Sequence, residues 1–244
     1  MFKRIKEDIN AAFHNDPAAR SKLEVILFYP GVHALWLHRI AYYLWNKKRL
    51  LPSRFISHIN RFLTGIEIHP AAQIGRGVFI DHGMGVVIGE TAAIGDGCII
   101  YKGVVLGGTT LEKTKRHPTL GKKVIVGSNA CVLGNITIGD NVRIGSGSVV
   151  VKDVPPSATV VGVPGRIIEQ KKKDSDMMMD HGQLPDPIAE ALKVVLRESR
   201  RLKERIKKLE SCSNICYKDD DFVSETESEV MTLFMKNYKD GDGI

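Results

Sequence analysis

The sequence predicts an α+β fold class, with an N-terminal helical domain, then a parallel β-helix, then a C-terminal helix and flexible tail. Three observations support it. Apolar residues recur at helical spacing before residue 65, aliphatic residues then recur every six positions, and helical spacing returns after residue 186. We therefore divide the chain into a helical domain (1–65), a β-helix domain (66–170), a linker with an amphipathic helix (171–210) and a polar tail (211–244).

The helical domain is predicted mainly from one apolar-rich stretch, LEVILFYPGVHALWLHRIAYYLW, at residues 23–45. Pro30 divides this stretch and suits the first turn of a new helix, where an N–H group is not needed. Asp16 stands directly before a proline, which marks a helix start, so we expect its carboxylate to cap a helix. A functional role competes with capping for this residue.

From Ile68 onward the spacing of aliphatic residues changes to six. Glycine follows many of these anchors directly, where we expect it to permit the turn at each corner. This hexapeptide repeat is typical of short strands that stack as a parallel β-helix with the anchors inside. The anchors are Ile68, Ile74, Ile80, Ile88, Ile94, Ile100, Leu106, Val126, Val132, Ile138, Ile144 and Val150.

The repeat is interrupted twice. The element that starts at Ile80 has eight residues rather than six, so its corner must bulge, and the bulge carries Asp81 and His82. The second interruption, between the anchors at positions 106 and 126, is predicted to leave the stack as a loop and brings Arg116 and His117, a strong carboxylate-binding pair. Loops on a rigid scaffold are favoured places for function.

The C-terminal helix is predicted to begin at Pro187. Its apolar residues are spaced alternately by four and three, which is a coiled-coil pattern, although a helix packed on its own subunit would fit as well. The residues of this pattern are Ile188, Leu192, Val195, Ser199, Leu202, Ile206 and Leu209.

Composition limits the classes of function. The net charge is +7, but the basic residues in 113–123, 171–173 and 193–208 lack aromatic interleaving, so solvated faces or a small anionic partner explain them better than nucleic acid. The N-terminus has no apolar core of a signal peptide, and the apolar stretch from residue 31 to 45 is too short and polar to span a bilayer. We expect a cytoplasmic protein with free cysteine thiols.

Four stretches carry a close resemblance: GIEIHPAAQIGRGVFIDHGMGVVIGETAAIGD, VVLGGTT, KRHPTLG and VVGVPGRII. Over residues 14–170 the chain resembles serine O-acetyltransferases, which belong to the left-handed parallel β-helix acyltransferases. The resemblance implies a left-handed β-helix and a trimer with active sites between neighbouring chains. In many relatives two such trimers pair into a hexamer, which is the larger assembly that the resemblance allows. It also implies transfer of acetyl from acetyl-CoA to the hydroxyl of L-serine, as a step of cysteine biosynthesis, without a metal.

A serine hydroxyl needs a base as it attacks a thioester, and histidine, with an ordinary pKa of about 6.5, supplies roughly 10²–10⁴ in rate. His82 is the candidate. A carboxylate should hold its other ring nitrogen, and the family places an acid where this chain has Glu67, although many relatives carry Asp there. Fifteen residues separate the two, nearly one coil, which would put them on adjacent rungs about 4.8 Å apart.

The substrate's charged groups indicate the binding residues. A guanidinium suits the serine carboxylate, and Arg116 supplies it with His117 as a second donor. The family pattern assigns the ammonium to Asp81 and Asp16.

The acetyl donor is expected in a groove between two β-helices. Backbone N–H groups near Gly107 and Gly108 should stabilise the oxyanion. The pantetheine arm should meet backbone near Gly108, Thr109, Ser128 and Ser146.

Two other enzyme classes share the scaffold. An acyltransferase for a sugar or an antibiotic would use the same fold and base. A metal enzyme of the γ-carbonic anhydrase type would use His69, His82 and His117 as zinc ligands.

The tail raises a further hypothesis. Its last residues, Asp242 to Ile244, resemble the family segment that inserts into O-acetylserine sulfhydrylase, where the free carboxylate and Ile244 would imitate that enzyme's substrate. Family behaviour also implies feedback inhibition by cysteine, which resembles serine in shape and charge.

Overall fold

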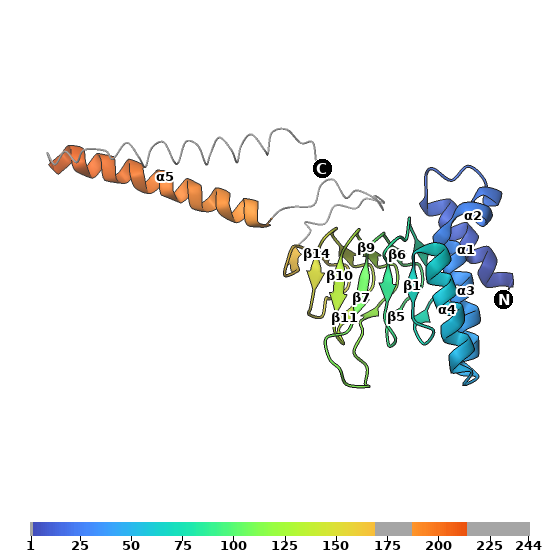
Figure 1. Ribbon diagram of the computed structural model, residues 1–244. Coiled ribbons are helices and arrows are strands. Elements are labelled where there is room, and N and C mark those ends of the chain that lie inside the picture. Colours follow the sequence, from blue (N-terminus) through green and yellow to red (C-terminus); the bar gives the residue numbers. More distant parts are fainter. Residues whose placement is uncertain (1, 169–186, 214–244) are drawn as a thin grey trace. The chain divides into compact units, whose positions relative to one another are not determined.

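The computed structural model describes residues 2–168 and 187–213 (Figure 1). The chain forms two compact units, Met1–Asp186 and Pro187–Ile244, which we describe separately. The helices are α1 (Phe2–Asn15), α2 (Lys22–Phe28), α3 (Pro30–Asn46), α4 (Leu50–Thr64) and α5 (Pro187–Ser213). In the described residues, no helix is both long and apolar enough to cross a membrane.

The ends of the N-terminal helices follow local chemistry. Pro30 occupies the first turn of α3, as predicted. The prediction that Asp16 caps a helix is wrong, because the chain turns for several residues before α2, and Ser21 caps that helix by accepting a hydrogen bond from the Glu24 amide at 3.1 Å. Asp16 instead closes a turn by accepting from the Ala18 amide at 2.8 Å.

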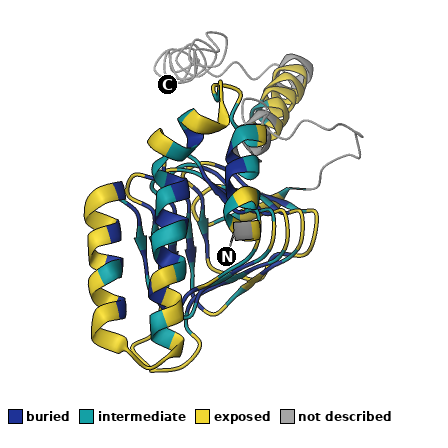
Figure 2. Ribbon diagram, turned by 90° about the vertical axis from the view of Figure 1, so that its right-hand side faces the viewer, coloured by how far each residue is buried: buried dark blue, intermediate teal, exposed yellow. Residues whose placement is uncertain are grey.

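Short strands form three parallel sheets that wind as the faces of a triangular prism (Figures 1 and 2). Sheet A contains β1 (Glu67–Ile68), β4 (Val87–Ile88), β7 (Val105–Gly107), β10 (Cys131–Leu133) and β13 (Val149–Val150). Sheet B contains β2 (Gln73–Ile74), β5 (Ala93–Ile94), β8 (Thr119–Leu120) and β11 (Thr137–Ile138). Sheet C contains β3 (Phe79–Ile80), β6 (Ile99–Ile100), β9 (Ile125–Val126), β12 (Arg143–Ile144), β14 (Thr159–Val161) and the antiparallel β15 (Arg166–Ile168).

The prism core confirms the hexapeptide repeat. Eleven of the twelve predicted anchors are buried, and Ile74 is partly buried against the same cluster. The expected restart of the repeat at Val126 is wrong by one strand, because Leu120 in β8 is already buried and aligned with Ile94. The second interruption is therefore a loop of residues 108–118.

The glycines that follow anchors act differently from the prediction. Their φ angles are not positive, and a Cβ on Gly95 would lie 2.3 Å from the Gly121 carbonyl oxygen of the next coil. Glycine is needed there because successive coils approach closely. The positive φ angles that turn the chain fall two residues later, for example at Gly97 (69°) and Asn141 (57°).

The helices cover one face and one end of the prism. Phe79, Ile99 and Ile125 point outward from sheet C and are buried against α1, α2 and α3. At the prism end, the Ser57 hydroxyl on α4 donates to the Ile68 carbonyl at 2.7 Å. Figure 2 views this end and shows α4 with its buried residues toward the rest of the unit and its exposed residues away from it.

The second unit is described only as α5, which begins at Pro187 as predicted. Four residues of its expected coiled-coil seam, Val195, Leu202, Ile206 and Leu209, are exposed. The predicted linker residues 169–186 and most of the predicted polar tail, 214–244, lie outside the described residues.

Candidate functional site

The predicted site residues divide between two edges of the prism. The first, which we call the His82 edge, joins sheet C to sheet A and carries residues 81–86. The second, which we call the Arg116 edge, joins sheet A to sheet B and carries residues 89–92 and the loop 108–118. Within one chain, the whole width of sheet A separates them.

His82 lies on a bulge, as predicted from the eight-residue element. Glu67 aligns with Val87, twenty residues on, whereas Val87 aligns with Val105, eighteen residues on. The two extra residues lie at this corner, where His82 adopts a φ of 58° and its side chain is 77% exposed. Its Nε2 atom lies 3.9 Å from a carboxylate oxygen of Asp81. The imidazole is thus presented outward beside a negative charge.

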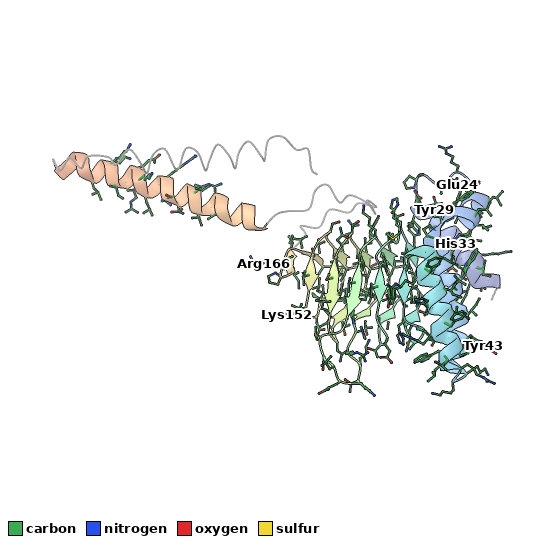
Figure 3. The ribbon with its side chains drawn as sticks, viewed as in Figure 1. Glu24, Tyr29, His33, Tyr43, Lys152 and Arg166 are labelled. Carbon is green, nitrogen blue, oxygen red and sulfur yellow. The ribbon has the colours of Figure 1, made fainter. Side chains whose placement is uncertain are left out.

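A second carboxylate lies close to Asp81. Tyr29, labelled in Figure 3, directly precedes α3. Its hydroxyl donates a hydrogen bond of 2.5 Å to Asp16. Burial raises the pKa of Asp81, and the nearby Asp16 raises it further, whereas His82 lowers it. Burial, followed by the charges of Asp81 and Asp16, also raises the pKa of Tyr101. The His82 edge therefore concentrates negative charge, which suits an ammonium group.

Glu67 begins β1 on sheet A and makes an ion pair with Arg61 at 3.2 Å. The expectation that fifteen residues are nearly one coil is wrong here, because the bulge lengthens this coil to twenty. The residue stacked on Glu67 is Val87, and His82 comes five residues before Val87, at the corner beside it.

The Arg116 edge is braced by an acid from the preceding coil. Arg116 donates to Glu90 at 2.7 Å, and this hydrogen bond lowers the pKa of Glu90. The Arg116 side chain is largely buried, so its planar fork is held in one direction.

His117 is fixed more tightly still. It is buried over Gly89, where a Cβ would lie 2.0 Å from the ring. Its Nδ1 atom accepts from the Thr91 amide at 3.2 Å and lies 2.9 Å from the Thr91 hydroxyl, which itself accepts from the amides of Arg116 and His117. Because Nδ1 is an acceptor, we assign the ring proton to Nε2, which becomes a donor. Burial lowers the pKa of His117, which keeps the ring neutral.

The residues expected along the acetyl donor also divide between the edges. Gly107, Gly108 and Thr109 lie where β7 runs into the loop of the Arg116 edge. Ser128 and Ser146 follow β9 and β12, so they lie higher on the edge that carries His82.

The three histidines considered as zinc ligands do not share one place in a chain. His69 and His117 lie on the edge between sheets A and B, and His82 lies on the other edge. His69 packs against Trp45 at 5.1 Å between ring centroids and accepts from the Ala71 amide, and burial lowers its pKa to about 4. Among the described residues, no group of three potential ligands could hold a metal ion.

Comparison with known proteins identifies the family to which this fold and site are similar. Residues 117–152 match the family model for bacterial transferase hexapeptide (six repeats). The chain is 52% identical over 209 residues to a serine acetyltransferase of Bacillus pumilus, covering 86% of this chain and 96% of that one.

Two solved structures share the fold and carry ligands. The serine acetyltransferase of Neisseria gonorrhoeae in complex with serine is 43% identical, with a TM-score of 0.67 over 69% of each chain. That of Brucella abortus in complex with coenzyme A is 38% identical, with a TM-score of 0.68 over 70% of this chain and 68% of that one. Fold and site thus define a left-handed β-helix acyltransferase of the hexapeptide class. Within that class, the chain belongs to the serine acetyltransferase family.

Sequence reasoning missed three residues that hold the candidate site: Tyr29, Glu90 and Thr91. Glu90 and Thr91 could have been found from the coil register. Thr119 aligns with Ala93, so counting back one coil from Arg116 and His117 leads to these two residues. Tyr29 gives no such signal, because its contact with Asp16 depends on how the helices pack.

Proposed function

We propose that the protein transfers acetyl from acetyl-CoA to the L-serine hydroxyl, giving O-acetyl-L-serine and CoA. The observation that carries this proposal is a pair of edges with opposite charge preference. The His82 edge has an exposed histidine near two carboxylates, and the Arg116 edge has a neutral His117 and an Arg116 held by Glu90. An ammonium-binding edge and a carboxylate-binding edge match the two charged ends of an amino acid.

In the proposed reaction His82 is the general base. It takes the proton from the serine hydroxyl while the oxygen attacks the thioester carbonyl carbon. The tetrahedral intermediate, stabilised by backbone N–H groups near Gly107 and Gly108, collapses with cleavage of the C–S bond. His82 then returns the proton to the departing thiolate. Glu67 orients the ring once Arg61 gives up or shares its carboxylate.

Serine is held at both ends in this proposal. Asp81 and Asp16 receive its ammonium group, and the Tyr29 hydroxyl holds the Asp16 carboxylate by a hydrogen bond. Arg116 and the Nε2–H donor of His117 receive its carboxylate. Specificity for an amino acid over a sugar or an antibiotic follows from this pairing of opposite charges.

A complete site needs two chains, because the two edges lie on opposite sides of sheet A. Above Glu67 of β1, the outward residues of sheet A form an apolar row of half-buried side chains, Val87, Val105, Cys131 and Val149. The corresponding row on sheet B, Gln73, Ala93, Thr119 and Thr137, is more polar. We infer that sheet A faces the axis of a trimer, so that the His82 edge of one chain meets the Arg116 edge of the next.

Mixing two inactive variants tests this arrangement. His82→Ala and Arg116→Ala chains should each show little activity in a thiol-release assay with acetyl-CoA and with L-serine kept well below the raised KM of the Arg116 variant. In trimers reassembled from equal amounts of both, about a quarter of the interfaces combine an intact His82 edge with an intact Arg116 edge. Activity should therefore return to roughly a quarter of the unmodified level.

The matched control mixes His82→Ala with Asp81→Ala, because both substitutions lie on the same edge. That mixture should stay nearly inactive, since no interface regains an intact His82 edge. Equal recovery in both mixtures, or none in the first despite confirmed mixed trimers, contradicts a site shared between chains. L-Serine should also be preferred over hydroxyl acceptors that lack an ammonium or a carboxylate.

The tail and the regulation extend the proposal. Cysteine differs from serine by one atom, so we propose that it competes for the same two edges as a feedback inhibitor. The terminal Asp242–Ile244 segment, outside the described residues, is proposed to bind O-acetylserine sulfhydrylase. Deleting Asp242–Ile244 should abolish that complex in a pull-down while acetyl transfer persists; a complex that survives the deletion refutes the tail's role. Pairing of trimers into a hexamer stays a prediction.

A further inference from the structure

The helical cap closes the prism end unevenly. On the side of sheet A, Ser57 donates to the Ile68 carbonyl, and on the side of sheet C, Gly31 packs so closely that a Cβ would lie 2.0 Å from the Ile80 carbonyl oxygen. The remaining anchor of the first coil, Ile74 in sheet B, is only partly buried. The cap therefore leaves the sheet B side of the prism end open.

A cavity of about 1030 Å³ lies at this open side. Its aliphatic lining comes from Leu35 on α3 and from Ile74, Ile94 and Leu120, which belong to three successive coils. The C-terminal half of α3 forms another wall, and Tyr43 lies there, at the opposite end of α3 from Tyr29 (Figure 3). This volume is that of a pocket for a small molecule with a substantial apolar part.

Among the buried, described side chains of the lining, one polar atom has no hydrogen-bond partner, the Nδ1 atom of His38. His38 is 3% exposed, and its Nε2 atom lies 3.2 Å from the Ala72 carbonyl oxygen, to which it donates. Burial lowers the pKa of His38 to about 4, so the ring is neutral and Nδ1 is left as an acceptor. Among the described residues nothing donates to Nδ1, and a buried acceptor without a donor costs free energy.

The charged residues at the cavity are all basic. Arg39 is held by the buried carboxylate of Asp8, whereas Arg4 and Lys47 make no ion pair with any described residue. Among the described residues that line the cavity there is no aspartate or glutamate. The lining therefore favours an anionic group at Arg4 and Lys47 and apolar atoms against the anchors.

We propose that this cavity binds a small amphipathic anion, with an apolar ring or chain, one N–H or O–H donor, and a carboxylate, sulfonate or phosphate. The apolar part packs on Ile74 and Ile94, the donor reaches His38 Nδ1, and the anionic group meets Arg4 and Lys47. None of these residues belongs to the proposed reaction, so this site stands independently of it.

The probe 1-anilinonaphthalene-8-sulfonate tests the proposal, because it combines aromatic rings, one N–H group and one sulfonate. Titration of the full chain should give a saturable fluorescence increase with one site per chain. The double substitution Arg4→Glu with Lys47→Glu should weaken binding roughly tenfold or more, since it reverses both charges. Ile74→Trp, which fills the cavity, should weaken binding with the charges intact.

Two matched controls make the result decisive. Lys48→Glu changes the same charge one residue away, outside the cavity lining, and should leave the dissociation constant unchanged. Phe62→Ser removes an exposed side chain of α4 to which the dye could adhere, and it should also have no effect. Absence of saturable binding, equal affinity in the double variant, or loss of binding in Phe62→Ser overturns the proposal. Acetyl transfer, measured in parallel, should be unchanged in the Arg4 and Lys47 variants.

Discussion

The two edges of the prism are built on opposite plans. The His82 edge presents an exposed imidazole from a two-residue bulge, beside the Asp81 carboxylate, whose pKa is raised by burial and by the nearby charge of Asp16. The Arg116 edge presents a largely buried guanidinium held by Glu90 and a buried imidazole held by Thr91. One edge keeps its reactive group accessible, and the other keeps its binding groups still.

This difference assigns separate duties to the two edges. A general base must reach the substrate's proton in the transition state, so exposure within a cleft between chains serves it. A carboxylate receptor gains affinity from donors that lose little freedom on binding, so rigid bracing serves it. Substitution of His82 should therefore lower kcat, whereas substitutions at the Arg116 edge, like those of the ammonium-binding Asp81 and Asp16, should mainly raise KM for serine.

The largest effect is expected for His82→Ala, which should lower kcat by roughly 10²–10⁴ because the base is lost. Glu67→Gln should cost less, since an amide can still orient the ring but cannot stabilise the imidazolium. Steady-state kinetics measure both, with circular dichroism and light scattering to show that the fold and assembly persist. Near-normal turnover in His82→Ala removes the base from this edge.

Arg116→Ala should come next, with KM for serine raised roughly tenfold to hundredfold and KM for acetyl-CoA little changed, because a charged hydrogen bond to the carboxylate disappears. Arg116→Lys should recover only part of this loss, since an ammonium cannot replace the planar fork. A fall in kcat with unchanged KM would place Arg116 in the chemistry rather than in binding.

Thr91→Ala should raise KM for serine by a smaller factor, roughly threefold to tenfold, because His117 and the Arg116 loop lose their shared brace. Thr91→Ser keeps the hydroxyl that accepts from two amides, so it should behave nearly as the unmodified protein. If both variants are equally impaired, the methyl group rather than the hydrogen bonds matters at this position.

The smallest effect concerns pH. Burial raises the pKa of Asp81, and Asp16 contributes in the same direction, so Asp81 becomes protonated at a higher pH than an ordinary aspartate. Only the ionised form attracts the ammonium, so KM for serine should rise as the pH falls through this raised pKa. Asp16→Asn should move the acid limb of the KM profile to lower pH by less than about one unit. A limb that stays in place means that Asp16 does not act on Asp81.

The sequence allowed much of this site to be predicted, because the repeat is regular enough for its exceptions to be counted. The bulge at His82 and the loop with Arg116 were both found as departures from a spacing of six. The same counting failed for Glu67. Its distance of fifteen residues from His82 was compared with the ordinary coil of eighteen, but the bulge lengthens the coil that begins at Glu67 to twenty residues.

Other features depend on contacts that no local pattern encodes. Asp16 was expected to cap a helix, but the turn before α2 and the hydroxyl of Tyr29 decide where its carboxylate points. The glycines after the anchors were attributed to turning, whereas the distance between successive coils requires them. The cavity beside α3 follows from how the cap is placed, which single-residue spacing cannot reveal.

The bulge at residues 81–86 leaves no trace one rung higher. Above it, Val87 aligns with Val105 at the ordinary eighteen residues, and the larger loop is likewise followed by eighteen between Cys131 and Val149. Each corner can therefore be lengthened, shortened or exchanged without disturbing its neighbours. Mutations at one edge of the β-helix can therefore change its chemistry while the strand register of the other coils stays the same.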